Sequence, residues 1–200
     1  MLGQDVNTKF NHLVKILSSK RFLDCQILCN EVPFFIADYQ IKKESEMLKL
    51  QGQLIKKLTE LNVKVLNVNI YDLVVEKLKE TGDWDWYIEN ESTISKASLK
   101  EDLQSILDVE SVVTPAIVKK MQETEYDVMF LTGIGEVFPY IRSHNILNNL
   151  QRFAKDKPTL MFFPGEYINQ QNSGSTLNLF GRLPDDKYYR AANIFEIQEV

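Results

Sequence analysis

The sequence predicts an α/β fold: a three-layer sandwich whose central sheet is mainly parallel and has about four to five strands. Four short apolar segments alternate with helical segments along the chain. This order builds parallel sheets, because parallel neighbours need a crossover connection and a helix supplies it. The apolar segments are also almost continuously hydrophobic, which indicates strands covered by helices on both faces.

The first half of the chain supplies two of these strands. Apolar residues at helical spacing predict an opening helix over residues 7–17. The runs VPFFIAD (32–38) and VKVLNVNI (63–70) are short, apolar and rich in aromatic or β-branched residues, so both are interpreted as buried strands. Between them, one helical stripe is formed by Met47, Leu50, Leu54, Leu58 and Leu61.

The second half repeats the alternation. It predicts a helix over 71–81, a strand over 127–133, a helix over 139–154 with Pro139 in its first turn, and a strand over 158–164. Two shorter helices are expected before the third strand. Capping-box spacing over 98–101 (SLKE) begins one of them, and a Thr-Pro pair at 114–115 begins the other.

Two regions fall outside this alternation. Residues 81–97 are acidic and contain Trp84, Trp86 and Tyr87, so they are interpreted as a surface insertion that folds back on its own aromatic residues. An exposed aromatic patch for a partner is the alternative. The expected organisation is an α/β domain over 1–167, followed by a loop and an aromatic tail over 168–200 that docks on it.

Composition restricts the function classes. The net charge of −5 arises from 28 acidic and 23 basic residues mixed along the chain, so no direct nucleic-acid binding is expected. Cys25 and Cys29 form neither a disulfide framework nor a four-ligand zinc site. The apolar runs are too short to cross a membrane and the first residues do not resemble a signal peptide, so a cytoplasmic location is expected.

The stretch FLTGIGEVFPY resembles a phosphate-binding turn, but its spacing argues against one. A dinucleotide fingerprint needs glycine at three positions, and here the third is Phe138, after Gly133 and Gly135. A phosphate loop of the G-x-x-x-x-G-K-[ST] type is also absent from the sequence. Backbone N–H groups at a helix start beside Pro139 would suit an anion, whereas Glu136 would repel one. No cofactor is therefore expected.

The helix after this turn has an unusual polar face. Arg142, Asn145 and Asn149 follow one stripe, and His144, Asn148 and Arg152 follow another. Asparagine is a mediocre helix former, so its repeated use indicates hydrogen bonding to a loop, a ligand or a partner. Bonds to the protein's own tail are the equally weighted alternative.

Acidic residues near the strand ends offer an alternative chemistry. The carboxyl ends of parallel strands form the usual ligand crevice, and Asp72, Glu136 and Glu166 lie just beyond predicted strands. Such carboxylates could hold a divalent metal in a metal-dependent enzyme. The run PDDK at 184–187 is too compressed for a nuclease signature, and with two histidines in the chain no Ser-His-acid or Cys-His arrangement is indicated.

Four long segments of the sequence resemble a known family. NEVPFFI, LTGIGEVFPYIRSHNILNNLQ, KDKPTLMFFPGEY and LFGRLPDDKYYRAANIFEI are similar to the hallmark segments of the BrxB family, a component of BREX bacteriophage-exclusion systems. These segments extend from residue 30 almost to the end of the chain, whereas residues 81–97 match only weakly.

The resemblance implies a role beside other BREX proteins, namely a DNA methyltransferase, a large ATPase and the phosphatase-like PglZ protein. It implies a non-catalytic adaptor that binds PglZ and supports phage restriction and host DNA methylation, and it brings no catalytic residues. A metal-dependent enzyme, or a degenerate nucleotide sensor in which residues 132–135 and Arg142 contact a phosphate, stays as an alternative. The expected partner-binding residues are Arg142, Asn145, Asn149, Arg152, Tyr188, Tyr189 and Arg190.

Overall fold

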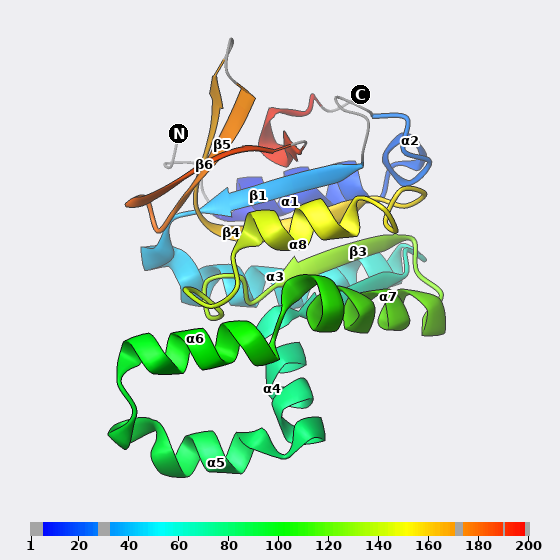
Figure 1. Cartoon of the computed structure of the whole chain (residues 1–200). Helices are drawn as coiled ribbons and strands as arrows, with labels where there is room; N and C mark the ends of the chain where they lie inside the picture. The colour runs from blue at the N-terminus through cyan, green and yellow to red at the C-terminus, as the bar shows by residue number, and fades with distance from the viewer. Residues whose placement is uncertain (1–5, 28–32, 171–173, 190, 199–200) are drawn as a thin grey trace.

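A parallel sheet lies between two layers of helices (Figure 1). The computed structural model describes residues 6–27, 33–170, 174–189 and 191–198. Within these ranges the strand order is β2-β3-β4-β1-β7, and every neighbouring pair on this path is parallel. The predicted fold class is confirmed. The strands of this path are β1 (Phe34–Tyr39), β2 (Val65–Asn69), β3 (Val128–Thr132), β4 (Thr159–Gln170) and β7 (Ala192–Asn193).

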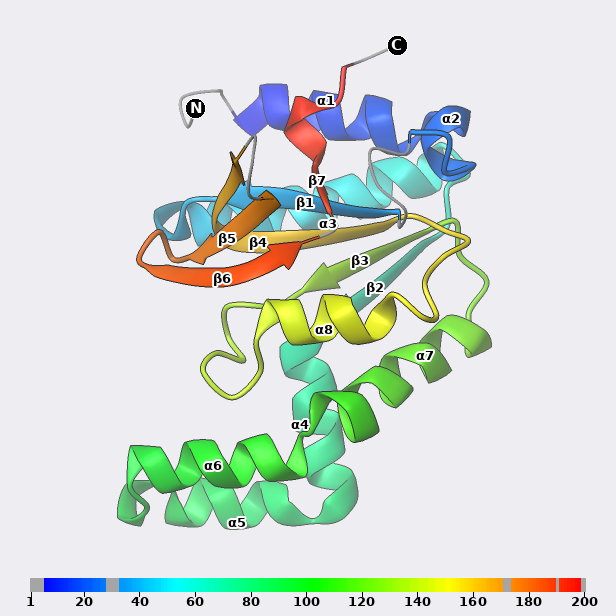
Figure 2. The same cartoon turned by 45° about the horizontal axis from the view of Figure 1, so that its top comes forward.

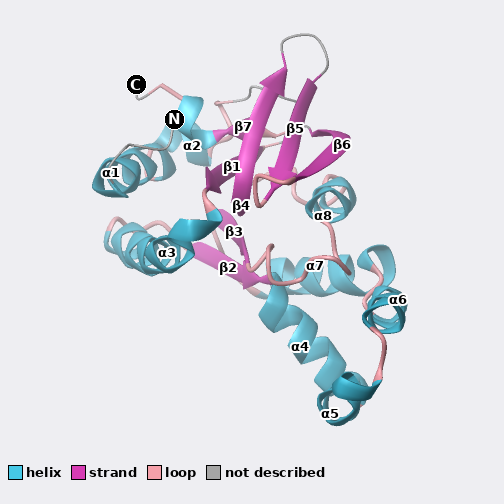
Figure 3. Ribbon diagram, turned by 90° about the vertical axis from the view of Figure 1, so that its left-hand side faces the viewer, coloured by secondary structure: helices cyan, strands magenta, loops and turns pink. Residues whose placement is uncertain are grey.

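Helices cover both faces of the sheet, as the view in Figure 3 shows. One face packs against α1 (Val6–Leu17), α2 (Lys20–Leu23), α3 (Glu44–Glu60) and the short turn η4 (Ile194–Glu196). The other face packs against α4 (Ile70–Thr81), α7 (Thr114–Glu123) and α8 (Ser143–Leu150). None of the helices in the described ranges is both long enough and apolar enough to span a membrane.

Burial on both faces explains the continuous hydrophobic runs in the strands. Successive side chains of a strand point to opposite faces, so Phe34 enters the core beneath α4, α7 and α8 while Phe35 enters the core beneath α1 and α3. Phe130 and Phe162 come from neighbouring strands and pack edge to face, with ring centroids 5.3 Å apart. Each fully buried phenylalanine contributes about 2–3 kcal/mol through the apolar area it removes from water.

Strand β4 extends beyond the parallel sheet into a second, antiparallel arrangement. Its second half pairs with β5 (Gly174–Leu179), which pairs with β6 (Leu183–Tyr189). The strand thus runs without interruption across residues 167 and 168, where the sequence predicted that the α/β domain ends and a loop begins. Tyr167 connects this extension to β1 and to the residue before β7: its N–H donates to Asp38 Oδ2 at 3.0 Å, and its hydroxyl donates to the Ala191 carbonyl at 2.8 Å.

Residues 83–106 form two helices, which we call the distal arm, and the first of them lies where the sequence predicts a folded-back surface insertion over 81–97. The arm comprises α5 (Asp83–Asn90), the turn η2 (Glu91–Thr93) and α6 (Lys96–Ile106), and it extends away from the sheet in Figures 1 and 2. The expected contact among its own aromatic residues is present, since Trp86 and Tyr87 pack edge to face and Tyr87 is buried. Ser95, and not the predicted Ser98, caps α6 by accepting a hydrogen bond from the Ser98 N–H.

The entry to α7 also differs from the expectation. Pro115 lies in the first turn as predicted, but Thr114 is already helical and its side chain is buried. A π-helical turn, η3 (Val109–Val113), precedes α7, and Asp108 caps it by accepting from the Ser111 N–H at 2.8 Å. The cap therefore lies one turn earlier than the Thr-Pro pair suggested, because the chain is already helical when it reaches that pair.

Candidate functional site

The first glycine of the turn after β3 makes room for a side chain of the protein itself. Gly133 has a positive φ of 72°, and a Cβ atom at this position would lie 2.2 Å from Asn69 Oδ1. Asn69 ends β2 and caps α4, where its Oδ1 accepts from the N–H groups of Tyr71 at 2.9 Å and Asp72 at 3.2 Å. The backbone of this turn is therefore shaped around a helix cap.

The second glycine is explained by packing in the same way. A Cβ atom at Gly135 would lie 2.8 Å from Pro164 Cγ and 3.1 Å from the ring of Phe180. Phe180 also packs edge to face against Phe138, with ring centroids 6.1 Å apart. Both close approaches are thus made by the protein's own side chains, which agrees with the sequence argument against a phosphate-binding turn.

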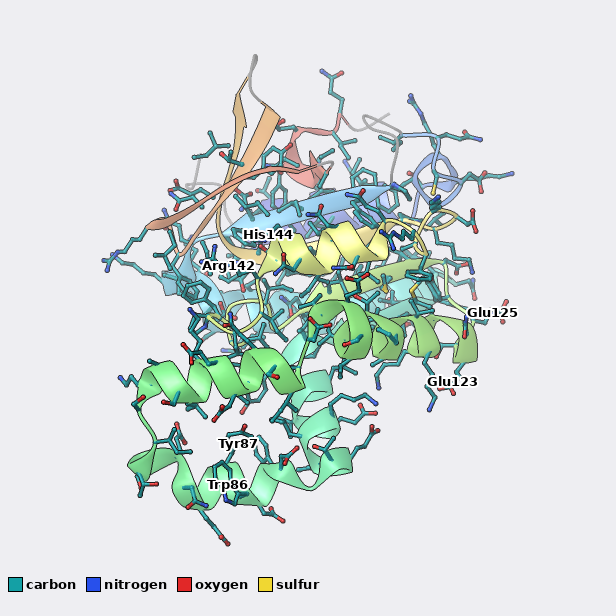
Figure 4. The ribbon with its side chains drawn as sticks, in the orientation of Figure 1. Trp86, Tyr87, Glu123, Glu125, Arg142 and His144 are labelled. Carbon is teal, nitrogen blue, oxygen red and sulfur yellow. The ribbon has the colours of Figure 1, made fainter. Side chains whose placement is uncertain are left out.

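The helix after the turn begins later than the sequence predicts. The structure places Pro139 in a loop, joined to Phe138 by a cis peptide bond, and α8 begins only at Ser143. The predicted role of Pro139 in aiming helix N–H groups at the sheet edge is therefore wrong. Arg142 occupies the N-cap position, its backbone is extended, and its side chain is exposed beside the first turn (Figure 4).

Helix α8 presents part of the polar face that the sequence indicated. Arg142 and Arg152 are exposed, and Asn145 and Asn149 are half-buried. The Asn149 Nδ2 donates to the Asn145 carbonyl at 2.8 Å, so this amide bonds to its own helix. His144, which was placed on a second polar stripe, is buried with 4% exposure. The placement of His144 on that stripe is wrong, whereas Asn148 and Arg152 of the same stripe are exposed. Helix α8 also packs on the π-helical turn before α7.

An exposed aromatic residue extends this face beyond the predicted residues. Phe153 follows α8 and is 51% exposed. Because residues three or four apart lie on the same side of a helical turn, it continues the row formed by Arg142, Asn145 and Asn149. We call Arg142, Asn145, Asn149, Arg152 and Phe153 the α8 strip. Helical spacing from Asn149 was the available signal for Phe153, but the sequence predicted a longer helix that ended on buried Ala154.

A groove lies between the start of α8 and the antiparallel extension of β4. A cavity of about 130 Å³ opens beside Arg142, and Leu183 lines both this cavity and an open depression of about 590 Å³. The depression also contains Lys42 and Arg182, with Glu166 as its acidic residue. Apolar walls with basic residues at the edge suit a protein segment that is apolar and acidic.

The predicted tail residues are only partly placed. Tyr188 and Tyr189 lie in β6, and Arg190 lies outside the described residues. Cys25 is half-buried, while Cys29 and Val32 also lie outside the described ranges, so the start of the predicted strand 32–38 is not placed.

The acidic residues near the strand ends come together only in part. Asp72 lies in the first turn of α4, Glu136 in the loop after β3, and Glu166 in β4. Partial burial, followed by the negative charges of Glu44 and Asp72, raises the pKa of Glu136 above its ordinary value. Glu44, at the start of α3, was missed by the sequence argument. Across the described ranges, no group of three or more His, Cys, Asp or Glu residues is arranged to hold a metal ion.

The raised pKa of Glu136 makes the stability of the protein pH-dependent at this position. The folded state binds this proton more tightly than the unfolded state, so Glu136 lowers stability as the pH rises above its ordinary pKa of 4.5. We expect Glu136→Gln to raise the thermal midpoint at about pH 7.5 and to leave it nearly unchanged at about pH 3.5. Glu101→Gln is the control variant, because it also removes one negative charge but lies at an exposed position of α6. An equal increase at both pH values would contradict this effect.

The fold and its strand-end turn define a class: an α/β domain with a mainly parallel sheet between helices, whose glycine turn is packed against its own side chains. The family model for BREX protein BrxB matches residues 66–194. The chain therefore belongs to the BrxB family of BREX proteins.

Full-length relatives support this assignment. A BREX protein BrxB of Bacillus cereus (strain H3081.97) is 32% identical over 197 residues, covering 96% of this chain and 98% of that protein. A BREX protein BrxB of Escherichia coli O9:H4 (strain HS) is 27% identical over 191 residues, covering 96% of this chain and 92% of that protein. No solved structure matches the chain.

Proposed function

We propose that this protein is a non-catalytic interaction subunit of a BREX antiphage complex and acts by binding a PglZ-family protein through the α8 strip. In this role it supports phage restriction and host DNA methylation without carrying out either reaction. Membership of the BrxB family supports action beside other BREX proteins. The observation that carries the proposed surface is the pair of exposed arginines with exposed Phe153 on one side of the molecule.

The chemistry of the α8 strip favours a protein partner. Arginine and aromatic residues are enriched at the energetic centres of interfaces, because they combine apolar area with directional hydrogen bonds. The groove beside Arg142 extends this surface with apolar walls and the cationic residues Lys42 and Arg182. An acidic, apolar segment of the partner would match both parts of the surface.

Co-purification tests the proposal. Tagged protein is co-expressed with the PglZ-family protein of its own BREX system, and the Arg142→Ala/Asn149→Ala variant is compared with wild type. Arg21→Ala is the matched control, because Arg21 is an exposed arginine on α2, across the sheet from α8. We expect wild type and the control to retain the partner and the double variant to lose most of it, with unchanged circular dichroism. Tyr189→Ala/Arg190→Ala tests the tail in the same way.

Two results would overturn the proposal. One is full retention of the partner by both double variants, which would separate binding from the α8 strip and the tail. The other is failure of wild type to retain the partner while the isolated protein binds Mg²⁺, Mn²⁺ or a fluorescent ATP analogue. That result would favour the alternative, a metal-dependent or nucleotide-sensing module that uses Asp72, Glu136 and Glu166.

A further inference from the structure

The distal arm carries most of the net negative charge of the protein. Its residues 83–106 include six carboxylates and two lysines, a net charge of −4, whereas the whole chain has a net charge of −5. The arm lies at the end of the molecule farthest from α1 and α2 (Figures 1 and 2). It is therefore a strongly acidic projection on a domain whose remaining surface is nearly neutral.

Two large apolar side chains are exposed on the same arm. Trp86 is 50% exposed and Ile88 is 60% exposed. Successive residues of a helix are about 100° apart, so these two side chains flank a ridge formed by Asp85 and Glu89 on the side opposite buried Tyr87. The exposed side of α5 thus has acidic residues along its centre and one large apolar side chain on each side of them.

Trp86 is held in position by the arm itself. Its ring packs edge to face on Tyr87 with centroids 5.1 Å apart, and Tyr87 is only 8% exposed. A side chain that is already ordered loses less conformational freedom when it binds. Figure 4 shows both residues on α5, well separated from Arg142 at the start of α8.

We propose that α5 is a docking element for a second protein surface, one that is positively charged around an apolar pocket. Trp86 and Ile88 would enter apolar sites, and Asp85 and Glu89 would face lysine or arginine. Charge complementarity selects this partner: the acidic arm would repel the phosphates of a nucleic acid and attract a basic protein surface. This proposal goes beyond the function proposed for the α8 strip, because it concerns a different element and a partner of opposite charge.

Site-specific photo-cross-linking tests the proposal on the complete chain. The Trp86→p-benzoylphenylalanine variant is co-expressed with the PglZ-family protein, the methyltransferase and the ATPase of the same BREX system, and the cross-linked peptide is sequenced. A second variant, Phe153→p-benzoylphenylalanine, reports on the α8 strip. We expect residue 86 to cross-link to a segment rich in lysine and arginine, with a yield that falls severalfold in about 0.5 M NaCl.

Affinity for the cross-linked protein gives the second measurement. We expect Trp86→Ala to weaken binding by about tenfold or more, and Asp85→Asn/Glu89→Gln to reduce the salt dependence of the affinity. Cross-linking from residue 86 only to a second copy of this chain, to an acidic segment or to nothing would overturn the proposal, as would unchanged affinity of Trp86→Ala. Cross-linking from residue 153 alone would leave the function proposed for the α8 strip intact and reject the role of α5.

Discussion

Gly133→Ala is expected to lower the free energy of unfolding by about 3 kcal/mol, because two costs combine at this position. The backbone has a φ of 72°, which disfavours any residue with a Cβ atom, and that atom would lie 2.2 Å from Asn69 Oδ1. Relief of the clash requires movement of Asn69, which caps α4. Urea denaturation followed by circular dichroism measures the loss.

Gly52→Ala is the matched control for this substitution. Gly52 lies inside α3, and a Cβ atom there would have no neighbour within 4 Å, so alanine should stabilise the protein by about 0.5–1 kcal/mol. We expect Asn69→Ala/Gly133→Ala to lose less stability than the two single losses added together, since removing the cap also removes the clash. Wild-type stability in Gly133→Ala would contradict the packing explanation of the glycine turn.

Phe153→Ala is expected to weaken binding to the PglZ-family protein by about 2 kcal/mol, or about thirtyfold in dissociation constant. The side chain is 51% exposed in the free protein, so its removal should cost little stability while an interface that covers it loses an aromatic anchor. Isothermal titration calorimetry on purified proteins measures the affinity, and thermal melting checks that the fold is retained.

Leu48→Ala provides the matched comparison for Phe153→Ala. Leu48 is 49% exposed on α3, which covers the opposite face of the sheet from α8. Its loss should leave the affinity within about twofold of wild type. Similar weakening by both substitutions would indicate a general effect on the protein, and an unchanged affinity in Phe153→Ala would remove this residue from the interface.

The sheet was predictable from the sequence because its physical cause is local and repeated. Strands β1, β3 and the first half of β4 are buried on both faces, so runs such as MFFP after Leu160 and FFIA at β1 are hydrophobic at every position. The helices between strands also carry a clear 3.6-residue period, as α3 does. These two signals were sufficient for the fold class, for β1, β2, β3 and the first half of β4, and for the helices α3 and α4 between them.

The sequence predictions differ from the structure where tertiary contacts decide the local structure. Helix α5 has one buried residue, Tyr87, so it lacks the apolar stripe that identifies a helix. His144 is a polar residue that the packing of α8 buries, a choice that periodicity cannot reveal. The candidate acidic residues were those that lie just after a predicted strand. Glu44 does not meet this criterion, although its negative charge helps to raise the pKa of Glu136.

Hydrogen exchange of the complex tests most directly whether the α8 strip binds the PglZ-family protein. The amide exchange of the protein is compared with and without a saturating amount of this partner, using mass spectrometry of peptides that cover residues 142–153. We predict that exchange slows in these peptides and that α2, which carries the control residue Arg21, is unchanged. Formation of the complex with unchanged exchange over 142–153 would contradict the proposed interface.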